Sequence, residues 1–400
     1  MMFLEFFIWG VWFVTLGIYL SNIGFTGIEI GSAYSTVAWA AVISAFFVSL
    51  VADKYFSAEK LNGILHLVGG VLMYYASTIH TPQLFFWVLL AYALCYSPTL
   101  ALTTAIGMQH CPEPGKQFPV IRVFGTLGWI VAGISISVLN IEGGPEPMWL
   151  AAICSIILGL YSFTLPKTPP RAKGKSQNIK EVLGLDALKL MKNRSFATLS
   201  ITALLITIPF AMYHAVTNMS MNEMGVENVA GKMTLAQMSE AIFMLMIPFL
   251  YIRLGVKKML MIGLITWSVR YALFAYGSSE VLIAFYYIGI LLHGVCYDFF
   301  FVTAQLYMDE RAPRDLRSSV QGFFVFLTWG VGWLIGSYIT GILLQVFEIQ
   351  DATSSTVRYN WPYIMLVPAV LSLIVAIFFG TLFRDEKLNA EEPAENQAAE

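Results

Sequence analysis

Long apolar stretches alternate with short polar breaks along the chain, and one longer polar break divides them into two sets of six. A helix of about 20 apolar residues crosses the ~30 Å hydrocarbon core of a bilayer. Twelve stretches have roughly this length, at residues 3–20, 31–51, 61–79, 83–106, 118–139, 148–165, 196–221, 232–252, 258–276, 280–307, 318–346 and 361–383. The pattern predicts an all-α membrane protein with twelve transmembrane helices in two six-helix bundles.

The composition supports this interpretation. Hydrophobic residues make up 58% of the chain and charged residues 12%, whereas about 25% of a soluble domain is charged. We therefore predict an N-terminal six-helix bundle (1–165), a cytoplasmic linker (166–194), a C-terminal six-helix bundle (195–384) and a disordered cytoplasmic tail (385–400). The linker is basic and proline-containing, and the tail is rich in alanine and glutamate.

The basic residues test this segmentation independently. Lysine and arginine concentrate in the short cytoplasmic loops of membrane proteins. Here every second loop is basic, so that 19 of the 23 basic residues fall on one predicted face of the membrane. We therefore expect a multi-pass protein with both termini in the cytoplasm.

Three ionisable side chains lie within predicted spans: Arg122, Glu240 and Asp298. A charge at bilayer depth costs about 3 kcal/mol or more, so it persists where it is paired, hydrated or bound to a ligand. Their placement indicates a polar pathway through the membrane.

The fifth predicted helix carries a candidate ligand surface. Arg122, Thr126 and Trp129 are spaced i, i+4 and i+7, so they share one helical face. They can present a guanidinium, a hydroxyl and an aromatic ring together. In the alternative interpretation, Arg122 reaches the lipid headgroups and Trp129 is a packing residue.

The eighth and tenth predicted helices carry further candidates. Gln237 and Glu240 are neighbours at i and i+3, and Glu240 either pairs with a cation such as Arg270 or carries a proton. His293 and Tyr297 share a face, with Asp298 turned about 100° from Tyr297. Asp298 binds a polar substrate or takes up a proton, with His293 assisting. Alternatively, these side chains form an interhelical hydrogen-bond network.

Other classes of protein receive less support from the residues. The four cysteines have neither paired spacing nor a neighbouring histidine cluster, and the chain contains no HExxH or GxSxG motif. We therefore expect no catalytic site, metal or cofactor. A facilitator for a sugar or oligosaccharide and a channel stay open as alternatives. A membrane sensor is a weaker one, because no long soluble domain is present.

Six stretches, in order along the chain, resemble the nucleoside:proton symporter family of the major facilitator superfamily: FFIWGVWFVTLGIYL (6–20), HLVGGVLMYYAS (66–77), FPVIRVFGTLGWIVAG (118–133), MSEAIFMLMIPFLYIRLGVKKML (238–260), WSVRYALFAYG (267–277) and HGVCYDFFFVTAQLYMDERAP (293–313). The resemblance implies a major facilitator fold. It also implies proton-driven nucleoside uptake across the bacterial inner membrane, by rocking of two bundles about a central cavity. We expect a monomer whose partners are a nucleoside, a proton and the lipid bilayer, without nucleic acid.

The resemblance also implies a set of substrate-binding residues: Arg122, Thr126, Trp129, Asn218, Gln237, Glu240, His293, Tyr297 and Asp298. Asn218 is included on the resemblance alone. Uptake of the coupling proton by Asp298 or Glu240 would neutralise a carboxylate and make occlusion of a polar substrate less costly. Proton and nucleoside would then favour the same closed conformation and each other's binding.

Two positions depart from the family pattern. Relatives place a glutamine three residues before the asparagine of the seventh helix, whereas this chain has Ala215 before Asn218. Relatives usually carry glutamine at position 5, where this chain has Glu5. Glu5 is either an additional proton site or a charge near the cytoplasmic surface. Both departures bear on which nucleosides are preferred.

Overall fold

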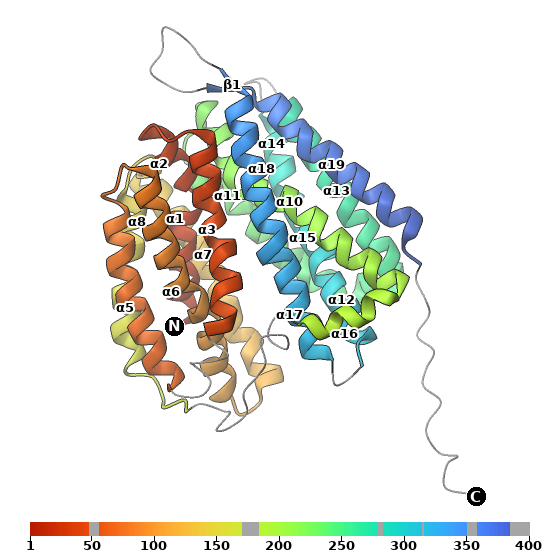
Figure 1. Ribbon diagram of the computed structural model, residues 1–400, viewed down its shortest axis with the longest axis horizontal. Helices are drawn as coiled ribbons and strands as arrows, with labels where there is room; N and C mark the ends of the chain where they lie inside the picture. The colour runs from red at the N-terminus through yellow and green to blue at the C-terminus, as the bar shows by residue number, and fades with distance from the viewer. Residues whose placement is uncertain (48–55, 170–183, 278–282, 314–315, 350–357, 385–400) are drawn as a thin grey trace, which may run out of the picture.

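The computed structural model describes residues 1–47, 56–169, 184–277, 283–313, 316–349 and 358–384, and this part is almost entirely helical (Figure 1). Two short strands, β1 (Glu348–Ile349) and β2 (Arg358–Tyr359), pair antiparallel beside the helices. Nine helical segments of the described residues are long and apolar enough to cross a membrane. The prediction of an all-helical membrane protein is confirmed at this level. The tail and residues 170–183 of the linker lie outside the described residues.

The helices form two groups that lie side by side (Figure 1). The N-terminal group consists of α1 (Met2–Phe13), α2 (Leu16–Asn22), α3 (Gly27–Phe47), α5 (Ala58–Ala76), α6 (Pro82–Gln109), α7 (Pro114–Leu139) and α8 (Glu146–Ser162). The C-terminal group begins with the 3₁₀ turn η2 (Leu185–Lys192). It continues with α10 (Arg194–Glu223), α11 (Val229–Met233), α12 (Leu235–Leu254), α13 (Val256–Tyr276), α14 (Ala284–Leu291), α15 (His293–Tyr297), α16 (Thr303–Arg311), α17 (Arg317–Val325), α18 (Trp333–Val346) and α19 (Trp361–Leu382).

Two helical runs of the C-terminal group contain π-helical turns. The first, η4 (Asp298–Val302), joins α15 to α16, and the second, η5 (Phe326–Gly332), joins α17 to α18. The sequence predicted regular helices at both places, whereas the hydrogen-bonding pattern is π-helical from Asp298 to Val302 and from Phe326 to Gly332. Turns of this kind are frequent at functional sites because they redirect side chains.

The two groups touch closely where α3 meets α18. A Cβ atom added to Gly31 would lie 2.5 Å from the carbonyl oxygen of Ser337 and 2.7 Å from the Cα atom of Gly341. Neither distance leaves room for a side chain. The glycines therefore allow the two helix backbones to meet directly, as small residues do in membrane helix packing.

A buried pair of titratable side chains joins four helices of the N-terminal group. Glu5 and His66 are 0% and 1% exposed, and the Nε2 atom of His66 lies 3.0 Å from Oε2 of Glu5. Thr99 donates a hydrogen bond to Oε1 of Glu5 at 2.6 Å, and the Nδ1 atom of His66 lies 3.1 Å from Oγ of Ser155. Glu5 is therefore buried among helices, and its depth relative to the cytoplasmic surface stays a prediction. Its role as a proton site stays a prediction.

Candidate functional site

A cavity of about 160 Å³ lies between the two groups of helices. Both groups contribute to its wall, which consists of Phe6, Trp9, Phe13, Arg122, Thr126, Trp129, Phe210, His214, Gln237, Glu240, His293, Tyr297, Trp329 and Trp333. The structure therefore brings together seven of the nine residues predicted to bind substrate, from α7, α12 and α15. We call this space the central cavity.

Arg122 lies on the wall of the central cavity, with its guanidinium carbon 4.1 Å from the centre of the Phe6 ring. This cation–π contact joins α7 to α1 and holds the charge beside the cavity. Thr126 and Trp129 line the same cavity, as their shared helical face predicted. Arg122 is also exposed and Trp129 also packs against Trp9, so the alternative interpretation of these two residues stays open.

Glu240 lines the cavity from α12, and its carboxylate lies 3.7 Å from the Nε2 atom of His293. The sequence left open a direct pair between Glu240 and Arg270. In the structure His293 stands between them, because Arg270 lies 2.9 Å from the Nδ1 atom of the same imidazole. The three side chains therefore form a row, with the glutamate at the cavity and the arginine buried behind it.

Two predicted residues do not line the cavity. Asp298 is 0% exposed in η4, and neither of its carboxylate oxygens has a hydrogen-bond partner among the described residues. Asn218 is 1% exposed on α10, one helical turn after the cavity residue His214, and its amide atoms likewise lack partners in the described part of the chain. Buried polar atoms without partners cost about 1–3 kcal/mol each. Both side chains are thus suited to receive a proton, water or ligand group.

Stacked aromatic rings line the cavity, and the sequence reasoning missed most of them. Trp329 and Trp333 stack at 4.8 Å with an interplanar angle of 13°. The Trp9 ring packs edge-on against Trp129 at 5.4 Å and lies 5.9 Å from Trp329. The spacing of four residues between Trp329 and Trp333 was a usable signal, because such residues lie on one helical face.

The central cavity continues into a second cavity of about 520 Å³. The two share Phe6, Trp9, Arg122 and Trp329. The second cavity then follows the C-terminal halves of α3 and α6, where it is lined by Ala41, Ser44, Ala101 and Thr104, among others. The space between the two groups therefore extends toward the end of the molecule at which α3 and α6 finish.

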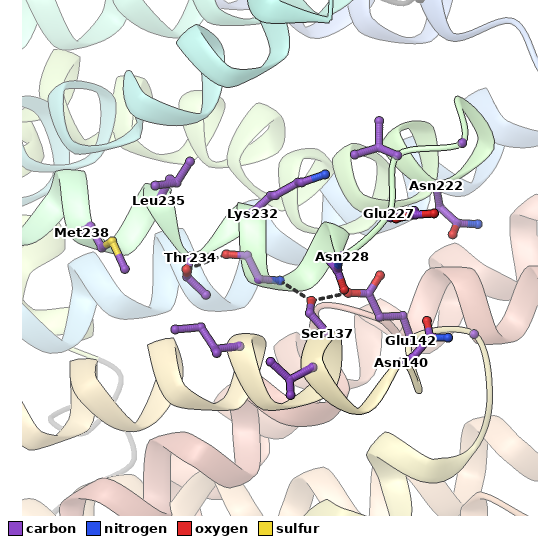
Figure 2. Close-up of a pocket in the computed structure, with 16 residues that line it drawn as sticks. Ser137, Asn140, Glu142, Asn222, Glu227, Asn228, Lys232, Thr234, Leu235 and Met238 are labelled. Atoms are coloured by element: carbon purple, nitrogen blue, oxygen red, sulfur yellow. Dashed lines mark hydrogen bonds between the residues drawn. The ribbon is translucent and has the colours of Figure 1, made fainter.

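At the opposite end, polar contacts join the two groups (Figure 2). Glu142, which follows α7, accepts hydrogen bonds from the backbone N–H groups of Val229 at 3.1 Å and Ala230 at 2.9 Å. Ser137 donates to Glu142 at 2.5 Å and accepts from the N–H of Gly231 at 2.7 Å. We call these contacts the Glu142 latch. It ties α7 of the N-terminal group to α11 of the C-terminal group.

The latch borders a wide concavity of about 990 Å³ between α7 and α12 (Figure 2). Its wall includes strongly exposed apolar residues such as Val138, which is 78% exposed. The polar groups of Ser137 and Glu142 are occupied by each other and by backbone N–H groups. The smaller central cavity is therefore the better candidate site, because its charged and aromatic groups come from both halves of the chain.

Three comparisons bear on what this arrangement does. A model of the family described as "Nucleoside H+ symporter" matches residues 1–388. The "Putative nucleoside transporter YegT" of Escherichia coli is 40% identical over 395 residues, which cover 96% of this chain and 92% of that protein. "Xanthosine permease" of Escherichia coli is 31% identical, covering 95% and 93%. A crystal structure of the nucleoside transporter NupG matches with a TM-score of 0.89 at 30% identity, covering 96% and 98%.

Proposed function

The chain belongs to the nucleoside H⁺ symporter family, and on this premise we propose that it imports nucleosides together with protons across a bacterial inner membrane by alternating access. It is a transporter and not an enzyme. The observation that carries the proposal is the central cavity, where both groups of helices bring Arg122, Glu240 and stacked tryptophans together.

The proposed architecture is the major facilitator fold with twelve spans in two six-helix bundles. The bundles comprise residues 1–165 and 195–384, joined by the linker 166–194 and followed by the tail 385–400. The two groups of helices and the match to NupG support it. Both termini are placed in the cytoplasm by the basic loops. We propose that the transporter works as a monomer in the lipid bilayer, with its cavity between its own two bundles.

We assign substrate contacts by chemistry. A nucleobase stacks on an aromatic ring, for which Trp129, Tyr297 and Trp329 are placed on the cavity wall. The amides of Gln237 and Asn218 each offer a donor and an acceptor to the base. Ribose hydroxyls meet the charged groups on the cavity wall, namely Arg122 and Glu240. Asp298, which does not line the cavity, is assigned to the proton. Ala215, which is 1% exposed, supplies no polar side chain for this recognition.

Trp329→Ala tests the aromatic contribution. Base stacking on an aromatic side chain contributes about 1–3 kcal/mol, so we expect the KM for nucleoside uptake to rise about tenfold. Trp329→Phe keeps an aromatic ring, so its KM should lie closer to that of the wild type. Uptake of labelled uridine and adenosine measures both variants. A KM unchanged in Trp329→Ala would show that the base does not use this ring.

The conformation is proposed to be inward-facing. The Glu142 latch and the close contact at Gly31 hold the two groups together at the predicted outer end. The second cavity extends from the site toward the predicted cytoplasmic end. Opening of the outer end then requires the latch to release its hydrogen bonds to α11.

Glu142→Ala should shift the population toward outward-opening states, because it removes the acceptor for two backbone N–H groups. Spin labels on Asn140→Cys and Glu227→Cys, in a background without the native cysteines, report the separation of the two groups at this end. We expect a larger fraction of long distances in Glu142→Ala and a smaller change in Glu142→Gln, which keeps one acceptor oxygen. An unaltered distance distribution in Glu142→Ala would contradict the latch.

Uptake into proteoliposomes tests the function as a whole. Labelled adenosine and uridine should accumulate when the outside is made more acidic than the inside, and accumulation should collapse when a protonophore is added. Labelled xylose should not accumulate. Transport of xylose, or nucleoside flux that only equilibrates, would favour a sugar facilitator or a channel instead.

A further inference from the structure

We propose that Arg270 is a positioning residue that fixes the tautomer of His293, so that this imidazole stays neutral and presents its Nε2–H to Glu240 and the substrate. This role in substrate binding rests on the proposed function. The proposal states which nitrogen atom of His293 carries the hydrogen, and this can be measured without a transport assay.

The hydrogen bond between Arg270 and His293 determines the pattern. The Nη1 atom of Arg270 lies 2.9 Å from the Nδ1 atom of His293, and both side chains are buried, at 0% and 2% exposure. A guanidinium carries only donors and keeps its charge in proteins. The Nδ1 atom must therefore be the acceptor and hold a lone pair. A neutral imidazole in this state carries its one hydrogen on Nε2.

Arg270 is held in place by aromatic rings. Its guanidinium carbon lies 3.7 Å from the centre of the Tyr213 ring, 5.3 Å from Trp267 and 5.4 Å from Phe274. Among the described residues no carboxylate pairs with it, and its Nε and Nη2 atoms lack hydrogen-bond partners there. Cation–π contacts thus stabilise the charge of Arg270, and the hydrogen bond to His293 orients the guanidinium.

Of the groups around His293, Arg270 opposes a second proton on the imidazole, whereas an ionised Glu240 acts in the opposite sense. From α13 His293 faces Arg270, from α12 it faces Glu240, and from α10 it faces Tyr213 at a ring distance of 5.2 Å and the neighbouring His214. On its own helical run the ring lies 5.9 Å from Tyr297, which precedes Asp298. Arg270 is the permanent charge nearest to the imidazole. A second proton on the imidazole would place an N–H against the N–H of Arg270.

His293 is then a fixed hydrogen-bond donor rather than a carrier of the coupling proton. Its Nε2 atom lies 3.7 Å from the Glu240 carboxylate, which is too long for a direct hydrogen bond, so a ribose hydroxyl or a water molecule beside the two groups can contact both. The assisting role in proton uptake that the sequence suggested for His293 is thereby replaced, and Glu240 and Asp298 are left to carry the proton.

Nuclear magnetic resonance of the full-length protein in liposomes, with ¹⁵N-labelled histidine, tests the proposal directly. The chain has five histidines, and loss of one set of signals in His293→Asn assigns this residue. We expect the neutral tautomer with hydrogen on Nε2 at every pH from about 5 to 8, although a free histidine titrates near 6.5. Hydrogen on Nδ1, or titration in this range, would overturn the proposal.

Transport provides a second readout. Arg270→Met removes the donor and the charge, so His293 becomes free to take a second proton. In nucleoside counterflow at equal pH on both sides, we expect Arg270→Met to lose about tenfold more activity between pH 7.5 and 5.5 than the wild type does. The added loss should vanish in Arg270→Met/His293→Asn and be smaller in Arg270→Lys, which keeps a donor.

The outcomes separate the two proposals. A pH profile of Arg270→Met with the shape of the wild type would overturn the positioning role. If Arg270→Met does not fold, the resonance measurement on the unsubstituted chain decides alone. If the tautomer is found as expected but the chain moves no nucleoside, the proposed function fails while the assignment to Arg270 stands.

Discussion

Asp298→Asn and Glu240→Gln are each expected to abolish proton-driven accumulation of nucleoside, lowering the ratio of internal to external concentration to about one. Each substitution keeps the shape of the side chain but removes the group that binds and releases a proton. Both carboxylates are placed for this role, because Glu240 lines the central cavity and Asp298 is buried without a hydrogen-bond partner in the described part of the chain. Accumulation in proteoliposomes with an imposed pH gradient measures the effect.

The control is a carboxylate that the proposal does not use. Glu227 is exposed at the edge of the outer concavity, so Glu227→Gln should accumulate nucleoside like the wild type. The midpoint of thermal unfolding of the two variants in detergent shows whether they are folded. If Asp298→Asn and Glu240→Gln both accumulate nucleoside normally, the assignment of the coupling proton to these residues is wrong.

Glu5→Ala is expected to lower the free energy of unfolding by about 3 kcal/mol or more, as breaking a buried pair usually does. Glu5 is 0% exposed and accepts from Thr99 at 2.6 Å while contacting His66 at 3.0 Å. Removal of its carboxylate leaves the Nε2 atom of His66 buried without this partner, while Thr99 keeps its hydrogen bond to the carbonyl of Tyr96 at 2.6 Å. The midpoint of thermal unfolding in detergent should fall by several degrees.

Glu5→Gln is the matched control, and its effect should be much smaller. Ser155 donates its hydroxyl hydrogen to the carbonyl of His66 at 3.0 Å, so its oxygen is free to accept from the Nδ1–H of His66. The Nε2 atom of His66 can then accept from a glutamine amide, while the amide oxygen accepts from Thr99. Equal unfolding midpoints for Glu5→Ala and Glu5→Gln would show that this network contributes little.

The membrane character of the chain and half of the residues that line the central cavity could be predicted from the sequence. The length of the apolar stretches predicts the transmembrane helices. An ionisable residue inside such a stretch indicates a functional site, because burying a charge in lipid costs free energy. Helical periodicity also placed Arg122, Thr126 and Trp129 on one face, and the structure puts all three on the cavity wall.

The sequence could not predict which faces of different helices pack against each other. Spacing along one helix does not tell which residue of another helix faces it, so the position of His293 between Glu240 and Arg270 was not foreseen. The π-helical turns have no clear residue signature, and η5 carries Trp329 into the cavity wall. Asp298 lies in the other such turn, which the sequence did not predict.

At Gly31 and Gly341 the backbones of α3 and α18 touch with no side chain between them. The two helices are therefore held at the shortest separation that backbone atoms allow, and any side chain at this crossing would force them apart. Gly31→Leu would separate α3 from α18 at the predicted outer end, and we expect this variant to lose nucleoside transport.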